Sequence, residues 1–187
     1  MEIIGQTDLE KKILQDEELI RGLEYGNPRP GHPEGPVKFH IQEILNMIDQ
    51  REYSQRERNI LRFLTIVHDS FKYQVDRTRP KVGENHHGWY ARKFAEKYVG
   101  EFGDDAELIL EILQWHDEAY LIKKHMENHA DEMDKWNARL DVFLVRPIKD
   151  WLFFLEFMYH DGNTGGKESG SAYWIHDILL ERGIIQK

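Results

Sequence analysis

The stretch ILRFLTIVHDSFKY, residues 60–73, joins an apolar helical repeat to a His-Asp pair. Its apolar residues recur at spacings of three and four, which places them on one face of a helix; they are Ile60, Leu64, Val67 and Phe71. His68 lies beside this face, and Asp69 follows it directly. The stretch therefore predicts a core helix that carries an imidazole and a carboxylate into the interior.

The same helical spacing recurs along the chain, and no segment alternates convincingly with the period of two that a half-buried strand needs. Turns rich in Gly, Pro and Asn separate the helical segments. We expect helices over about 8–25, 36–49, 54–68, 85–100, 104–116, 123–141 and 147–160, and a last one ending near 180. Ser54, Asn85 and Asp104 are the expected N-caps of three of them. The sequence predicts an all-α fold of roughly seven helices in a single domain, residues 1–187.

The composition excludes several classes of protein. A formal net charge of -9 argues against non-specific binding to nucleic acid or to an anionic membrane, since both need a basic surface. No apolar run is long enough to cross a bilayer, and the first residues lack the pattern of a signal peptide. The absence of cysteine excludes disulfides and thiolate metal sites. These features predict a cytoplasmic protein with no membrane contact.

Helical phase separates the ten histidines into inward and outward ones. His87 is in phase with Ala91 and Phe94 and faces the core, whereas His86 is in phase with Tyr90 and faces out. By the same reasoning, six ionisable residues point into one interior; they are His40, His68, Asp69, His87, His116 and Asp161. So many imidazoles and carboxylates in an apolar core are costly unless they bind cations, and both groups suit first-row divalent metals.

The His-Asp dipeptide of the opening stretch recurs three times, at 116–117, 160–161 and 176–177. In the first of these, Asp117 is expected to run into a polar turn, and in the second Asp161 is the better placed member. The pair at 176–177 lies in a mixed amphipathic helix and is interpreted as structural. His125 and His129 have the spacing of a metal pair, but their helix is charged on every face and is expected to be solvated.

In chain order the inward residues are a His, a His-Asp pair, two further His and an Asp, and this order resembles the HD superfamily of metal-dependent phosphohydrolases. The resemblance covers about residues 30–166. The four-ligand set of that superfamily matches His40, His68, Asp69 and Asp161. The extra histidines of its dinuclear branch match His87 and His116, and HDSFK matches its HDxxK form through Lys72. The resemblance implies an HD-type helical domain around a buried metal site.

The resemblance also implies a function, the hydrolysis of a phosphate ester of a nucleotide or another small phosphorylated metabolite. One divalent ion would be held by the four-ligand set and a second by His87 and His116, with Asp69 bridging. Asp69 and Lys72 would be the catalytic residues. Asp69 would bridge the two ions, and Lys72 could add positive charge at a developing oxyanion. The identity of the ion stays open among Mn, Fe, Co, Mg, Ni and Zn, as does the filling of one or both positions.

Two loops could contact the phosphate of such a substrate, one directly after the HD helix and one, residues 162–170, after the last candidate ligand. Together with Lys72, the candidate side chains are Arg77, Arg79, Lys81, Asn163, Thr164 and Lys167. Each loop has a simpler interpretation as a solvated surface turn, and the sequence does not separate the two interpretations.

Two other functions fit the same residues. The six-ligand pattern also resembles the diiron oxygenases of the HD superfamily, such as myo-inositol oxygenase, in which a lysine after the HD pair contacts the substrate. Tightly bound iron with oxygen consumption would identify an oxygenase, whereas phosphate release stimulated by Mn, Co or Mg would identify a hydrolase. The third interpretation is a non-catalytic HD domain that acts as a binding module.

Overall fold

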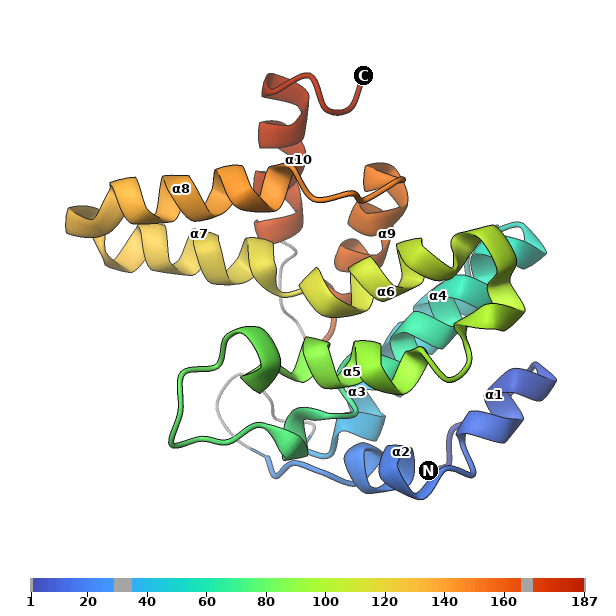
Figure 1. The fold of residues 1–187 in the computed structure, drawn as a ribbon. Coiled ribbons are helices and arrows are strands. Elements are labelled where there is room, and N and C mark those ends of the chain that lie inside the picture. Colours follow the sequence, from blue (N-terminus) through green and yellow to red (C-terminus); the bar gives the residue numbers. More distant parts are fainter. Residues whose placement is uncertain (1, 29–34, 166–169, 187) are drawn as a thin grey trace.

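Helices make up all of the regular secondary structure in the computed structural model, which describes residues 2–28, 35–165 and 170–186 (Figure 1). The helices are α1 (Asp8–Ile13), α2 (Glu17–Leu23), α3 (Val37–Asp49), α4 (Gln55–Val67), α5 (His87–Ala95), α6 (Ala106–Trp115), α7 (Glu118–Asn128), α8 (Met133–Leu144), α9 (Trp151–Gly162) and α10 (Gly170–Glu181). Short 3₁₀ turns lie between some of them. The prediction of an all-α fold is confirmed.

Helix α4, which ends at the His-Asp pair, is the central helix of the fold. It packs against α3, α6 and α9, and every residue from Ile60 to Val67 is buried. A helix buried on all sides needs its polar groups satisfied, and Thr65 meets this need by donating its hydroxyl to the carbonyl of Leu61 at 2.7 Å. The predicted apolar face is therefore only part of the buried surface of α4.

Local signals at the ends of α3 and α4 have the predicted effect. Pro36 occupies the position before α3 and needs no hydrogen bond from its nitrogen there. Ser54 caps α4 in a reciprocal arrangement, in which its hydroxyl accepts from the backbone of Glu57 and the Glu57 carboxylate accepts from the backbone of Ser54. These signals fix where the two helices begin, and hence where the first turn of α3 carries His40 and the end of α4 carries His68.

Several helices differ from the expected segments. The segment 8–25 is two helices, because Asp16 caps α2 through its side chain and ends the preceding turn. The charged segment 123–141 is likewise two helices, α7 and α8, which form an antiparallel hairpin extending from the rest of the fold (Figure 1). Asn85, the expected cap of α5, is instead buried and donates to the carbonyls of Asp76 and Pro80. His86 caps α5 in its place.

The turn after α4 is packed tightly against the N-terminal part of the chain. A Cβ atom on Gly22 of α2 would lie 1.5 Å from the carbonyl oxygen of Ser70, so only glycine allows α2 to approach this turn. The Ser70 hydroxyl donates to the carbonyl of Ile66 at 2.7 Å. The backbone that carries His68 and Asp69 is therefore held from both sides.

A search of the described residues for membrane-spanning helices found none of sufficient length and apolar character.

Candidate metal centre

Five helices bring the six predicted ligands together at one place in the fold. His40 lies on α3, His68 and Asp69 follow α4, His87 begins α5, His116 follows α6, and Asp161 lies in the last turn of α9. All are buried except Asp161, whose side chain is 23% exposed. Helical phase therefore identified the right faces.

The first group of donor atoms belongs to His40, His68, Asp69 and Asp161. His40 Nε2 lies 2.9 Å from Asp161 Oδ1 and 3.7 Å from Asp69 Oδ2. His68 Nε2 lies 3.4 Å from the same Asp161 oxygen and 3.6 Å from the same Asp69 oxygen. Two imidazole nitrogens and two carboxylate oxygens thus face one another.

The second group lies on the other side of Asp69. His87 Nε2 is 3.1 Å from His116 Nε2 and 3.3 Å from Asp69 Oδ1. His116 Nε2 is 3.8 Å from the same oxygen. Asp69 therefore presents Oδ2 to the first pair of histidines and Oδ1 to the second.

These spacings suit metal coordination. Two ligand atoms that each bind an ion at about 2.1 Å lie roughly 3.0–3.5 Å apart when the angle between them is near 90–110°. The buried donors of His40, His68 and Asp69 form one set that could hold an ion, and those of Asp69, His87 and His116 form another. Two buried sets that share one carboxylate are the geometry of a bridged pair of ions.

Hydrogen bonds on the outer ring nitrogens fix the orientation of two of the histidines. His68 Nδ1 lies 2.9 Å from the carbonyl oxygen of Thr65, and His116 Nδ1 lies 2.9 Å from that of Leu113. A carbonyl oxygen can only accept, so each Nδ1 carries a hydrogen, and in the neutral ring each Nε2 directs a lone pair into the cluster. This is the tautomer that a metal ligand requires.

Thr164 performs the same task for His40. Its hydroxyl donates to the carbonyl of Asp161 at 3.1 Å, so it accepts from His40 Nδ1 at 2.9 Å. Its hydroxyl is therefore already engaged in orienting His40, in a residue that is 3% exposed. The expectation that Thr164 contacts a substrate phosphate is not what this geometry favours.

The role of Thr164 can be tested with two substitutions. Thr164→Val removes the hydroxyl at nearly constant volume and leaves His40 Nδ1 without its partner, so we expect metal affinity to fall about 10–100-fold. Thr164→Ser keeps the hydroxyl and should bind metal like the wild type. Isothermal titration of each variant with Mn²⁺ measures the difference, and equal affinity in the valine variant would contradict the assignment.

One potential metal-ligand atom in the cluster makes no hydrogen bond. His68 Nε2 is buried and makes no hydrogen bond with the residues that the structure describes. A buried acceptor left unsatisfied costs free energy, which a bound cation would recover. The donor types, their spacing and this free lone pair all fit a divalent ion.

The carboxylates of the cluster stay ionised in spite of their surroundings. Burial raises the pKa of Asp69, but Lys72 and His68 outweigh it and hold this pKa well below its ordinary value. Burial also raises the pKa of Asp161, but the neighbouring imidazoles of His40 and His68, whose Nε2 atoms lie 2.9 Å and 3.4 Å from its Oδ1, outweigh burial and keep this pKa well below its ordinary value. The cluster thus provides charged oxygen ligands.

The pKa values of the two histidines in the second group are shifted in opposite directions. Burial lowers the pKa of His87 and favours the neutral ring. Burial also lowers the pKa of His116. A hydrogen bond with Asp69 and the negative charge of nearby carboxylates outweigh burial and raise this pKa to about 9. These carboxylates therefore favour positive charge at the second group, from a proton or from a metal ion.

Lys72 lies at the edge of the cluster and forms an ion pair with Asp69. Its side chain is 28% exposed, so the ammonium reaches both the carboxylate and solvent. Burial lowers the pKa of Lys72, but Asp69 and Asp117 outweigh this and raise it. Lys72 is therefore a permanent positive charge beside the candidate bridging residue.

Two residues near the cluster differ from their sequence interpretation. Asp117 lies 3.4 Å from His87 Nε2 instead of facing away in a polar turn. His86 is only 14% exposed and lies 3.8 Å from Asp117 Oδ2. His86 precedes α5 and Asp117 precedes α7, so neither follows the phase of a helix; only the recurrence of the His-Asp dipeptide pointed to Asp117.

Three further histidines in the described part of the chain lie outside the cluster. His160 is buried at 2.6 Å from the hydroxyl of Tyr53, and His176 is 35% exposed. His125 stacks on Trp136 with ring centroids 4.2 Å apart, on the α7–α8 hairpin. The placement of His176 agrees with the structural role expected for it, whereas His125 packs on a buried tryptophan instead of lying on a fully solvated face.

Most candidate phosphate contacts lie on the surface. Arg77 is exposed and donates to the hydroxyl of Tyr25, Arg79 and Lys81 are exposed, and Asn163 donates to the carbonyl of Tyr159 at 2.7 Å. Lys167 lies outside the described residues. Only Lys72 and Thr164 among the candidates touch a cluster residue, and Thr164 does so on the far side of His40.

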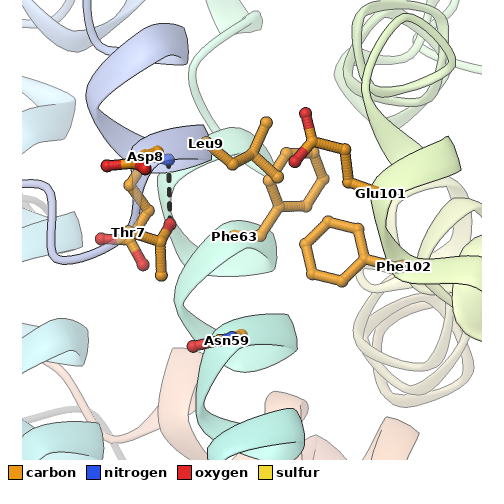
Figure 2. Close-up of a pocket in the computed structure, with 8 residues that line it drawn as sticks. Thr7, Asp8, Leu9, Asn59, Phe63, Glu101 and Phe102 are labelled. Carbon is orange, nitrogen blue, oxygen red and sulfur yellow. Dashed lines mark hydrogen bonds between the residues drawn. The ribbon is translucent and has the colours of Figure 1, made fainter.

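A pocket of about 190 Å³ lies away from the cluster, between α1, α4 and the turn at Val99–Asp105 (Figure 2). Figure 2 shows Phe63, Phe102 and Glu101 among the side chains that line it. The pocket meets α4 at Asn59 and Phe63, and no residue of the cluster lines it. The pocket therefore does not belong to the metal centre.

No protein-family model, no curated protein and no solved structure was found to match this chain.

Proposed function

We propose that the protein is a metal-dependent hydrolase of phosphate esters, acting on a nucleotide or another small phosphorylated metabolite. The observation that carries the proposal is the position of Asp69, whose two oxygens face two separate pairs of histidines. Two ions bridged by one carboxylate at about 3.5–4 Å from each other are typical of enzymes that cleave phosphate esters. The proposed family is the HD superfamily of phosphohydrolases.

Divalent ions bound at such a centre lower the pKa of a coordinated water and neutralise charge on phosphoryl oxygens. The protein's own residues have three tasks in this chemistry. The imidazoles and carboxylates would hold the ions, and Lys72 would supply positive charge. The imidazoles are kept oriented by the hydrogen bonds that they donate to the carbonyls of Thr65 and Leu113 and to the hydroxyl of Thr164. Lys72 is near enough to the cluster to meet a phosphoryl oxygen.

The charge of the side chains in the cluster explains why the substrate would need the ions. Three carboxylates, Asp69, Asp117 and Asp161, lie near one ammonium, Lys72, which leaves an excess of negative charge. A phosphate ester would be repelled from this place unless divalent ions reversed the charge. In this proposal Arg77, Arg79 and Lys81, on the loop between Lys72 and α5, help to bind the phosphorylated substrate.

The test is metal analysis of the purified protein, followed by a screen for phosphate release from nucleotides and sugar phosphates with Mn²⁺, Co²⁺ and Mg²⁺. We expect His68→Ala to lower turnover at least about 1000-fold, because metal catalysis contributes several kcal/mol. His176→Ala, which changes a surface histidine of another His-Asp pair, should leave turnover unchanged.

Three outcomes would contradict the proposal. Tightly bound iron with oxygen consumption and no phosphate release would identify an oxygenase. Bound metal without turnover of any kind would identify a binding module. Absence of bound metal together with absence of activity under every divalent cation would exclude the metal centre itself.

A further inference from the structure

Asp117 occupies the N-cap position of α7 but does not cap that helix. Its side chain accepts no hydrogen bond from the first turn, and its backbone is helical, with φ -86° and ψ -10° in place of the extended conformation that is usual at an N-cap. By contrast, Thr7 and Asp16 have extended backbones and accept from the turns that they precede. An aspartate at this position normally stabilises its helix by such a bond. The carboxylate of Asp117 is therefore directed elsewhere.

The carboxylate of Asp117 faces the second group of histidines, His87 and His116. Asp117 Oδ2 lies 3.4 Å from His87 Nε2. His87 Nε2 has two further donors at almost the same distance, His116 Nε2 at 3.1 Å and Asp69 Oδ1 at 3.3 Å. One imidazole nitrogen thus has three potential co-ligands around it, and the side chain of Asp117 is 30% exposed.

The packing of α5 against α6 holds these residues in place. A Cβ atom on Gly88 would lie 2.7 Å from the carbonyl oxygens of both Leu113 and Gln114, so glycine allows the two helices to meet directly beside His87. The Leu113 carbonyl also accepts from His116 Nδ1. The distance between His87 and His116 is therefore set by the backbone.

His86, the other neighbour of Asp117, is not available as a ligand through its inner nitrogen. Its Nδ1 accepts from the backbone nitrogen of Gly88 at 3.1 Å, which leaves the hydrogen of the neutral ring on Nε2. That Nε2 lies 3.8 Å from Asp117 Oδ2 and presents a donor, not a lone pair. His86 can support the carboxylate of Asp117, directly or through a water molecule, but cannot replace it.

We propose that Asp117 is a ligand of the second metal position, which it shares with His87, His116 and Asp69. This inference rests on the proposed function, because it assumes that both groups bind ions. With Asp117, the second position has two imidazoles and two carboxylates, the same donor types as His40, His68, Asp69 and Asp161 provide at the first. Matching donor sets predict that the protein retains two ions and not one.

The experiment is a titration of the full-length, chelator-treated protein with Mn²⁺, followed by calorimetry and by electron paramagnetic resonance. The wild type should bind two ions per chain and show the spectrum of a coupled pair. Asp117→Asn should keep one ion with unchanged affinity and bind the second at least about 100-fold more weakly, since loss of an outer partner alone costs about 10–100-fold. Its spectrum at one equivalent should be that of an isolated ion.

Two control variants sharpen the result. Asp141→Asn changes an exposed aspartate of α8 and should bind two ions like the wild type. His86→Ala should also bind two ions, because His86 is not a ligand. Circular dichroism of each apo-protein verifies that the fold is kept.

Retention of both ions in Asp117→Asn would overturn the inference, as would loss of both. Loss of the second ion in His86→Ala but not in Asp117→Asn would assign the position to His86 and would also overturn it. These failures are distinct from failure of the proposed function, in which the wild type itself would bind no Mn²⁺ or would bind it without releasing phosphate from any ester.

Discussion

Replacement of Asp69 by asparagine is expected to abolish the binding of both metal ions. Asp69 is the one residue whose two oxygens face both groups of histidines, at 3.6–3.7 Å for Oδ2 and at 3.3–3.8 Å for Oδ1. Asparagine keeps the shape but offers a single neutral oxygen in place of two charged ones. Both Kd values should rise more than about 100-fold, a larger effect than loss of an outer partner.

If the proposed hydrolase activity is present, the same variant should lose it almost completely. Loss of metal catalysis corresponds to several kcal/mol of transition-state stabilisation, which is at least about a 1000-fold fall in turnover. Metal content by mass spectrometry and phosphate release are measured on the same preparation. The matched control is Asp177→Asn, which changes the aspartate of an exposed His-Asp pair and should alter neither quantity.

The prediction separates Asp69 from its neighbours. Asp117→Asn is expected to lose one ion and Asp69→Asn to lose both. Retention of one tightly bound ion in Asp69→Asn, in a protein that remains folded by circular dichroism, would show that the two groups are independent and that Asp69 does not bridge them.

Of all the substitutions proposed for this protein, Arg62→Ala is expected to lower the free energy of unfolding the most. Arg62 is 2% exposed in the middle of α4 and pairs with Glu10 at 3.0 Å and with Asp49 at 2.9 Å. It also donates to the carbonyl of Ile4 at 3.2 Å. This one side chain therefore ties the N-terminal segment and the end of α3 to the central helix.

Removal of one partner from a buried ion pair leaves the other charge without compensation. The Glu10 carboxylate, 1% exposed, would keep its charge in the interior, so we expect a loss of about 3–5 kcal/mol in the free energy of unfolding. Urea denaturation followed by circular dichroism measures this quantity. Arg56→Ala, on the same helix, breaks an ion pair whose arginine is 60% exposed and should cost no more than about 1 kcal/mol.

A double variant tests the stated cause. Arg62→Met combined with Glu10→Leu replaces the pair by apolar groups of similar size, and such replacements are often neutral. It should therefore be more stable than Arg62→Ala. If the double variant is as unstable as the single one, the cost comes from lost packing and not from an uncompensated charge.

Residues inside helices were predictable from the sequence because a helix fixes the direction of each side chain. The spacing of apolar residues placed His40 and Asp161 on inward faces, and both lie in the cluster. Ser54, as an expected N-cap, predicted the start of α4. Such signals are local, so no knowledge of the rest of the fold was needed.

The directions of His86 and Asp117, and the pairs that join residues distant in sequence, were not predictable in this way. His86 and Asp117 lie just outside helices, where no periodicity assigns a direction. The breaks at 14–16 and 129–132 divided two expected helices because capping and turn geometry outweighed the continuing helical pattern. The apolar spacing of α4 also gave no reason to expect a charged residue such as Arg62 in the core.

The sequence by itself determined the all-α fold, the positions of the central helices and the six residues that point inward from them. Only the tertiary structure decided that Asp69 faces two groups, that Thr164 orients His40 from 124 positions away, and that Asp117 turns toward His87. The physical reason is the range of the interactions. Periodicity and capping act within a few residues, whereas the contacts of a metal centre join segments whose distance depends on the packing of every helix between them.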